Sequence, residues 1–173
     1  MNRIQNKNLK GGENMLGVAL LFVGIVLISN GMCRLYNVDG KAQSVMNIFT
    51  GGLTLILNIV SITRGDYYSG ATGLLFTFTY LYVAINGIFN LNPIPYGWFS
   101  LFVTINTLPA GYLSLKSDWR MSIIWWLWGV LWLTGWIETV PKKNLGKFTP
   151  MLAIFEGIVT AWIPGFLMLI DMW

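Results

Sequence analysis

Four tryptophans on one helical face are the most distinctive residues of this sequence. They follow one another at spacings of three and four residues, as Trp125, Trp128, Trp132 and Trp136. Such spacing places them on one face of an α-helix. Tryptophan near a helix end usually belongs to the aromatic belt at a membrane interface, but Trp128 and Trp132 lie near the middle of an apolar run. These two residues therefore either line a passage or only pack against other helices.

Two further stripes could face the same space. An apolar stripe in the first apolar run ends in an amide and consists of Leu16, Leu20, Val23, Leu27 and Asn30. A stripe in the third run consists of Phe76, Tyr80 and Val83, with Thr79 and Asn86 at its edge. Walls of this kind cannot replace the hydration shell of an ion, whereas a small, flat, neutral amide loses much less on leaving water. Aromatic rings could stack on its faces, and Tyr80, indole N–H groups and Thr or Asn side chains could bind its edges.

Two acidic residues lie in or at the apolar runs. Glu156 is eight residues into the last run, which is about 12 Å deep at the helical rise per residue. An ionisable group at such depth indicates a function by default; alternatively, Glu156 bonds to Asn or Thr partners and only fixes the packing. Glu138 is less informative, because it lies close to the membrane interface.

The side chains of enzymes and metal sites do not form any recognisable set. The sequence has no histidine and a single cysteine, Cys33, and it contains neither a glycine-rich phosphate loop nor a cluster of metal ligands. We therefore expect no enzymatic activity, no metal and no cofactor. The absence of histidine also removes the side chain that senses pH near neutrality.

The composition indicates that these residues are positioned by helices in a lipid bilayer. Hydrophobic residues make up 55% of the chain and charged residues only 10%, against about 25% charged in soluble domains. Runs of roughly 20 apolar residues can span a membrane, and six occur, at 15–36, 43–63, 69–89, 96–115, 119–140 and 148–170. We predict an all-α integral membrane protein whose six helices form a compact bundle of three helical hairpins. The net charge of +4 comes mostly from residues in the short gaps, where they orient helices, so we expect no nucleic-acid partner.

We expect the first fourteen residues to be a polar leader before a six-helix membrane domain at 15–173. Lys10–Glu13 can be encoded by a purine run that resembles a bacterial ribosome-binding site, and we hypothesise that translation starts at Met15. Six spans put both termini on one side. Without the leader, that side carries three basic residues and the other side five. The positive-inside rule therefore predicts that loops 1–2, 3–4 and 5–6 lie in the cytoplasm and both termini outside it.

The first and third runs show a weak internal repeat. Gly17 precedes Asn30-Gly31 by the same spacing as Gly73 precedes Asn86-Gly87. Internal repeats are common in transport folds. Hairpins 1–2, 3–4 and 5–6 are therefore predicted to be three copies of one unit around a pseudo-threefold axis, chance similarity of apolar helices being the alternative.

Several segments closely resemble the urea/amide channel family, of the UreI and AmiS type. They are MLGVALLFVGIVLISNG (15–31), GLLFTFTYLYVAING (73–87), WFSLFVTINTLPA (98–110), WGVLWLT (128–134) and LGKFTPMLAIFEGIVTAWIP (145–164). The resemblance covers nearly all of residues 15–173. It implies a six-helix protomer with its own pore, assembled into a homohexameric ring in the inner membrane, through which urea moves passively toward a cytoplasmic urease.

The resemblance also implies which residues line the narrow parts of the pore. They match Leu16, Leu20, Val23, Leu27, Phe76, Tyr80, Trp125, Trp128, Leu131, Trp132 and Glu156. One tryptophan of the family, a turn before Trp125, corresponds to Met121 here, so this end of the pore is expected to differ. The acid-activated member of the family has a long, histidine-bearing loop between helices 2 and 3. Here that loop is reduced to Arg64–Tyr68, which is typical of an ungated channel.

Three other interpretations remain open. The cargo could be a short-chain aliphatic amide, delivered to an amidase by the same fold. The protein could be a proton-coupled carrier that uses Glu156, although no second intramembrane charge is available for a relay. It could also be a structural membrane subunit whose tryptophans only pack.

Overall fold

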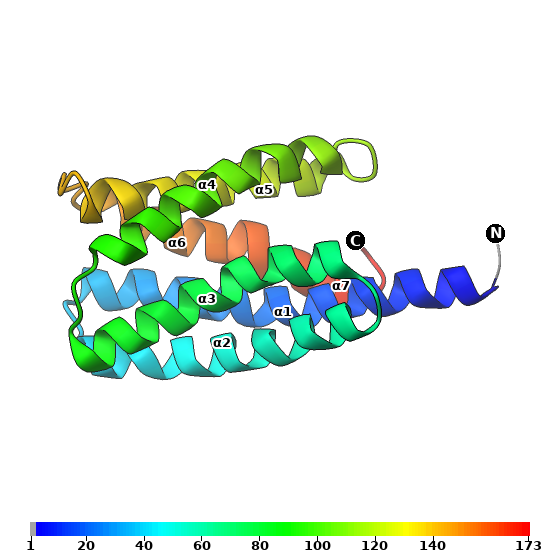
Figure 1. The fold of residues 1–173 in the computed structure, drawn as a ribbon, viewed down its shortest axis with the longest axis horizontal. Helices are drawn as coiled ribbons and strands as arrows, with labels where there is room; N and C mark the ends of the chain where they lie inside the picture. The colour runs from blue at the N-terminus through cyan, green and yellow to red at the C-terminus, as the bar shows by residue number, and fades with distance from the viewer. Residues whose placement is uncertain (1–2) are drawn as a thin grey trace.

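The computed structural model describes the backbone of residues 3–173 and the side chains of residues 14–173. The polar leader predicted at 1–14 lies almost entirely outside the described side chains. The helices are α1 (Arg3–Leu35), α2 (Gly40–Thr63), α3 (Tyr67–Phe89), α4 (Ile94–Ser114), α5 (Trp119–Thr139), α6 (Phe148–Glu156), the π-helix η1 (Gly157–Trp162) and α7 (Ile163–Leu169). Because α6, η1 and α7 form one continuous run, the predicted all-α fold of six helices is confirmed (Figure 1).

The helix boundaries have identifiable causes in the sequence. Asp39, Asp66 and Asp118 precede α2, α3 and α5, and each accepts a hydrogen bond from a backbone N–H of the first helical turn. Such caps satisfy donors that have no partner within the helix. At the other end of α3, Asn90 adopts the left-handed conformation, with φ of 51°, which ends the helix.

Among the residues that the structure describes, length and composition allow four helical segments to cross a membrane: Asn14–Leu35, Gly40–Thr63, Tyr67–Phe89 and Phe148–Leu169. Helices α4 and α5 have 21 residues each, which corresponds to roughly 30 Å and to the thickness of a bilayer core. Their mean hydropathy is lower because they are rich in tryptophan, tyrosine, serine, threonine and glycine. Both run alongside the other helices (Figure 1), so they belong to the same membrane-embedded bundle.

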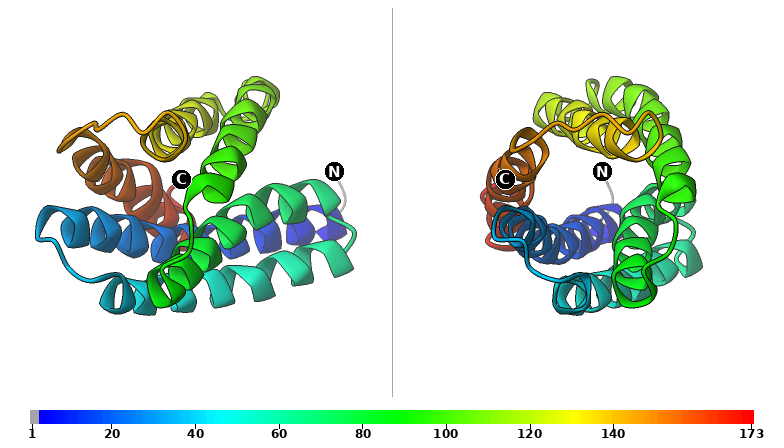
Figure 2. Two further views of the ribbon diagram at one scale, coloured as in Figure 1. Left: turned by 60° about the vertical axis from the view of Figure 1, so that its left-hand side comes forward. Right: turned by 90° about the vertical axis from the view of Figure 1, so that its left-hand side faces the viewer.

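The helices surround a common axis (Figure 2, right) and pack most extensively in three pairs. These pairs are α2 with α3, α4 with α5, and α1 with the α6–η1–α7 run. The helices joined by the α1–α2, α3–α4 and α5–α6 loops make far less contact. The most closely packed pairs are therefore helices 2–3, 4–5 and 6–1 of the six, whereas the predicted repeat units were the hairpins 1–2, 3–4 and 5–6. A short loop brings two helix ends together without requiring their faces to pack.

Glycines explain which helices pair, because a residue without Cβ lets two backbones approach closely. On α1, Gly17, Gly24 and Gly31 recur every seven residues and all face the last run. On α3, the interface with α2 includes Gly73 and Gly87. The repeat seen in the sequence thus marks equivalent interfaces, in which α1 packs on the last run as α3 packs on α2.

The π-helix η1 interrupts the last run just before Pro164. Proline has no N–H to donate to the carbonyl four residues earlier, and its ring clashes with that carbonyl. In this run the carbonyl belongs to Thr160, inside η1. Widening of the turn at Gly157–Trp162 accommodates the proline without breaking the run.

Candidate functional site: two cavities that meet at an aromatic constriction

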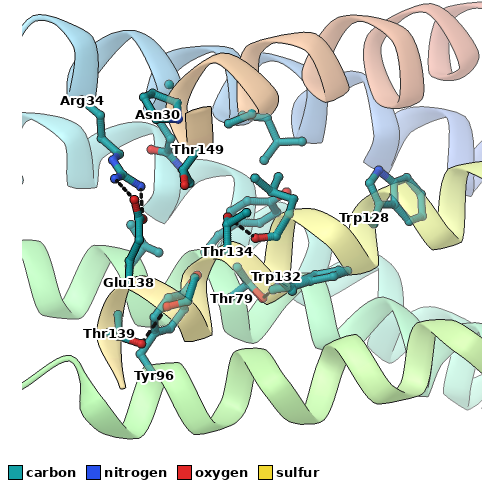
Figure 3. Close-up of a pocket in the computed structure, with 18 of the residues that line it drawn as sticks. Asn30, Arg34, Thr79, Tyr96, Trp128, Trp132, Thr134, Glu138, Thr139 and Thr149 are labelled. Carbon is teal, nitrogen blue, oxygen red and sulfur yellow. Dashed lines mark hydrogen bonds and ion pairs between the residues drawn. The ribbon is translucent and has the colours of Figure 1, made fainter. Parts of the chain in front are cut away.

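Two cavities lie inside the bundle, one toward each end. The Arg34-side cavity has a volume of about 210 Å³ and is lined by residues that include Leu27, Asn30, Arg34, Tyr80, Leu131 and Trp132 (Figure 3). The Asp66-side cavity has a volume of about 430 Å³ and is lined by residues that include Leu16, Leu20, Val23, Asp66 and Trp125. Most lining residues come from α1, α3 and α5, which carry the three stripes of the sequence.

Phe76 and Trp128 belong to the walls of both cavities. The Phe76 ring centroid lies 4.7 Å from that of Trp128 and 4.7 Å from that of Trp132, with the rings edge to face. Trp125 packs edge to face on Trp128 at 5.2 Å. These separations are typical of direct aromatic contact. The four rings, Phe76, Trp125, Trp128 and Trp132, form the wall that we call the aromatic constriction.

Helix α1 provides an aliphatic surface in the same buried cluster. Leu20, Val23 and Leu27 are each less than one-tenth exposed and pack in one hydrophobic core with the four rings. Val23 lines the Asp66-side cavity and Leu27 the Arg34-side cavity. The partition between the cavities is therefore formed by aromatic rings and branched aliphatic side chains.

The indole N–H groups of Trp128 and Trp132 are not free donors in the constriction. Trp128 Nε1 donates to Thr160 Oγ1 at 2.8 Å, and Trp132 Nε1 donates to Thr79 Oγ1 at 3.0 Å. The sequence suggests these N–H groups as partners for a polar cargo. In the structure both are bonded to protein hydroxyls, so the two rings present mainly C–H and π surface to the path.

The predicted site residues fall on the walls of one cavity or the other, except for Glu156. Glu156 is 0% exposed, and neither carboxyl oxygen has a hydrogen-bond partner among the described residues. It lies where α6 meets η1, and the adjacent Gly157 packs against Gly24 and Leu27 of α1. Neither cavity includes Glu156 in its wall.

The Arg34-side cavity also contains polar residues that were not among the predicted site residues. An ion pair joins Arg34 on α1 to Glu138 on α5, with N–O distances of 2.9 and 3.0 Å (Figure 3). Gln43 and Thr149 line the same cavity. These residues lie at helix ends, so helical periodicity did not predict them. The only signal in the sequence was the opposite charge of Arg34 and Glu138.

An amide cluster adjoins this cavity and joins α1 to α2. Asn30 and Asn47 exchange hydrogen bonds through their side-chain amides, at 3.0 and 2.7 Å, and Gln43 donates to Asn30 at 3.1 Å. Asn47 is completely buried. The cluster satisfies these polar groups where lipid and apolar side chains cannot.

At the opposite end of the bundle, Asp118 joins the α4–α5 loop to the C-terminal residue. Its carboxylate accepts hydrogen bonds from Arg120 at 2.9 Å and from the Trp173 indole at 2.8 Å, and the Arg120 guanidinium lies 4.1 Å from the Trp173 ring centroid. Partial burial raises the pKa of Asp118, but the hydrogen bonds from Arg120 and Trp173 outweigh it and leave the pKa below its ordinary value.

The sequence is similar to a family of membrane transporters and to several of its members. The profile of the AmiS/UreI family transporters matches residues 15–172. A protein of Helicobacter pylori described as an acid-activated urea channel is 50% identical over 195 residues, which cover 92% of this chain and 100% of the relative. A putative amidate substrates transporter protein of Mycolicibacterium smegmatis is 36% identical over 167 residues, which cover 92% of this chain and 78% of the relative.

The fold is similar to that of a solved structure. The crystal structure of the urea channel from Helicobacter pylori matches with a TM-score of 0.87 and 54% sequence identity, over 91% of this chain and 99% of that one. The sequence alignment with the acid-activated relative spans 195 residues, whereas this chain has 173. Because the alignment covers only 92% of this chain, about 36 of its positions in the relative have no counterpart here.

Proposed function

Since the chain belongs to the AmiS/UreI family of transporters, we propose that it is a passive channel that conducts urea across the bacterial inner membrane toward a cytoplasmic urease. The observation that carries this proposal is the pair of cavities, which meet at the aromatic constriction inside a single chain. Sequence similarity to urea channels, at 50% identity, supports the choice of cargo.

The chemistry of the constriction suits a flat, uncharged molecule. Its rings offer faces on which urea can stack. The indole N–H groups of Trp128 and Trp132 are already hydrogen-bonded to threonines, so these two rings offer few polar atoms to an ion. Stripping the water from an ion costs far more than such walls can return. Urea regains hydrogen bonds on either side, where the Arg34-side cavity provides amide, hydroxyl and charged groups.

The assembly and location are parts of the same proposal. Both cavities are lined by one chain, which supports one pore per protomer in a homohexameric ring. The basic residues Arg34, Lys41 and Lys142 lie toward the end of the bundle that also holds the Arg34-side cavity. We place this end in the cytoplasm, and both termini outside, on the positive-inside rule.

A short-chain amide permease is the second candidate, because the Mycolicibacterium smegmatis relative is described as a transporter of amidate substrates. The two functions differ by one group on the cargo, since acetamide replaces one amino group of urea with a methyl group. Apolar walls discriminate weakly between cargoes that differ by a single small group. A flux measurement is therefore needed to rank the two.

The test measures swelling or isotope uptake in vesicles that contain the purified protein, with urea and acetamide compared at equal gradients. We expect urea to enter several-fold faster than in protein-free vesicles and faster than acetamide. Trp128→Ala and Trp132→Ala should raise the permeability to acetamide or methylurea relative to that to urea. Trp98→Ala should leave this ratio unchanged, because Trp98 is 55% exposed on the outer face of α4. Protein-containing vesicles as tight to urea as empty ones would refute the channel, and faster acetamide entry would favour the amide permease.

A further inference from the structure

Two threonines hold the two central tryptophans of the constriction, and they do so by the same arrangement. Trp128 donates its indole N–H to Thr160 of η1, and Trp132 donates its own to Thr79 of α3. Thr160 is 1% exposed and Thr79 9% exposed. The Trp128–Thr160 bond is thus fully buried, whereas Thr79 also belongs to the wall of the Arg34-side cavity.

Each threonine hydroxyl can only accept from the indole. Thr160 donates its single proton to the backbone carbonyl of Glu156 at 2.6 Å, and Thr79 donates to the carbonyl of Leu75 at 2.7 Å. A hydroxyl has one donor and two acceptor lone pairs. Since the proton is committed to the carbonyl four residues earlier, the free lone pairs face the tryptophan, which suits an indole that can only donate.

The two bonds connect helices that otherwise have little contact. Helix α5 packs along α4 and, less extensively, against α6. Its Trp128 side chain reaches across to η1 and its Trp132 side chain to α3. The rings are therefore held at both ends, by α5 through their Cβ atoms and by the opposite wall through their nitrogens.

We propose that Thr79 and Thr160 are positioning residues that fix the orientation of the Trp132 and Trp128 rings and thereby set the width and polarity of the constriction. With both bonds intact, the indole N–H groups are withheld from the path and the cargo meets carbon surface. Without either bond, the corresponding indole loses its protein acceptor, and its N–H becomes available to permeating molecules. The transport arm of the test rests on the proposed function, but the spectroscopic arm does not.

The test uses Thr160→Val and Thr79→Val, which keep the shape of the side chain and remove the acceptor. Thr107→Val is the matched control, because Thr107 is 1% exposed and its hydroxyl donates to the backbone carbonyl of Thr104 without contacting an indole nitrogen of the constriction. Thr160→Ser and Thr79→Ser restore the hydroxyl. Two measurements are made on the purified protein: ultraviolet resonance Raman spectra of the indole N–H band, and the permeability ratio of urea to acetamide and methylurea in vesicles.

We expect the valine variants at positions 79 and 160 to shift the indole N–H band and to change the urea-to-acetamide ratio by about fivefold or more, as the loss of a buried hydrogen-bond acceptor predicts. The serine variants should return both readouts to the parent values, and Thr107→Val should alter neither. The proposal is overturned if the spectra shift while the ratio stays at the parent value, if neither changes, or if Thr107→Val changes both equally. If the parent conducts no urea, the proposed function fails, and the Raman spectra alone still decide whether the threonines hold the rings.

Discussion

Among the individual residues, the tryptophans of α5 show how one side-chain type can serve two purposes. The rings of Trp128 and Trp132 help to build the constriction, while their nitrogens tie α5 to the opposite wall. Trp126, on another face of α5, donates instead to the carbonyl of Leu108 on α4 at 3.5 Å. The spacing of tryptophans along a helix shows which rings share a face, but the partner of each N–H depends on which helix lies opposite.

The acidic residues at the Asp66-side end give a prediction about pH. The pKa of Asp118 is lowered by the hydrogen bonds from Arg120 and Trp173. A lowered pKa in the folded state means that these contacts stabilise the fold above the ordinary pKa near 4 and are lost only as pH falls through the lowered value. Asp118 therefore remains ionised at pH 5. The chain has no histidine to titrate between pH 5 and 7.5, and only residues 64–66 separate α2 from α3.

We predict that urea flux stays constant, within about twofold, between pH 5 and 7.5, because a histidine switch of the usual kind is missing. Vesicles that contain the protein are assayed at matched urea gradients across this range. A channel that is shut at pH 7.5 and opens several-fold at pH 5 would contradict the prediction. Glu156→Gln then identifies the sensor, because loss of the response in this variant would point to the buried glutamate.

At the scale of the elements, close packing of α1 on the last run depends on glycine at position 24. A Cβ at this position would lie 2.7 Å from Trp162 Cβ and 2.9 Å from the Gly157 carbonyl oxygen. Main-chain atoms of η1 cannot move aside as the tip of a flexible side chain can. By contrast, a Cβ at Gly52, on α2, would have no atom within 4 Å.

We predict that Gly24→Ala destabilises the protein by about 1–3 kcal/mol, the usual cost of overpacking, whereas Gly52→Ala is neutral or slightly stabilising. Thermal unfolding of the detergent-solubilised protein, followed by circular dichroism, compares the two variants with the parent. Equal melting temperatures for Gly24→Ala and the parent would show that α1 and η1 can separate without cost, and that the glycines do not determine the pairing.

At the scale of the whole molecule, three helix pairs form a closed ring around the path. Helix α3 packs along α2, and α5 packs along α4. Helix α1 packs along the last run, which closes the ring. This cyclic arrangement requires the first helix and the last run to pack side by side (Figure 2). The Arg34–Glu138 ion pair and the two tryptophan–threonine bonds then link the pairs to one another.

The orientation of the ring in the membrane gives a prediction at this scale. In a Cys33→Ser background, Ser117→Cys reports on the α4–α5 loop and Asn144→Cys on the α5–α6 loop; both positions are exposed. Because basic residues favour the cytoplasmic side, we expect a membrane-impermeant maleimide to label spheroplasts of the first variant but not of the second. Lysis should expose both. Labelling of only the second variant in intact spheroplasts would invert the proposed orientation.

The sequence by itself determined the six membrane runs and the helix faces that the structure places on the cavity walls. Both follow from local physical constraints: about 20 apolar residues are needed to cross a bilayer, and helical periodicity assigns each residue to a face. The runs predicted at 43–63 and 69–89 differ from α2 and α3 by only a few residues at one end. The stripes that end in Asn30 on α1 and include Phe76 on α3 lie on cavity walls.

Only the tertiary structure decided how these faces meet. Which helices pair depends on backbone approach at Gly24 and Gly87, and the direction of the Trp128 nitrogen depends on Thr160, which lies 32 residues away in the chain. The burial of Glu156 outside both cavities likewise depends on how far the last run is rotated about its axis. Periodicity within one helix carries no information about that rotation or about the partner helix, because both are set by contacts between distant segments.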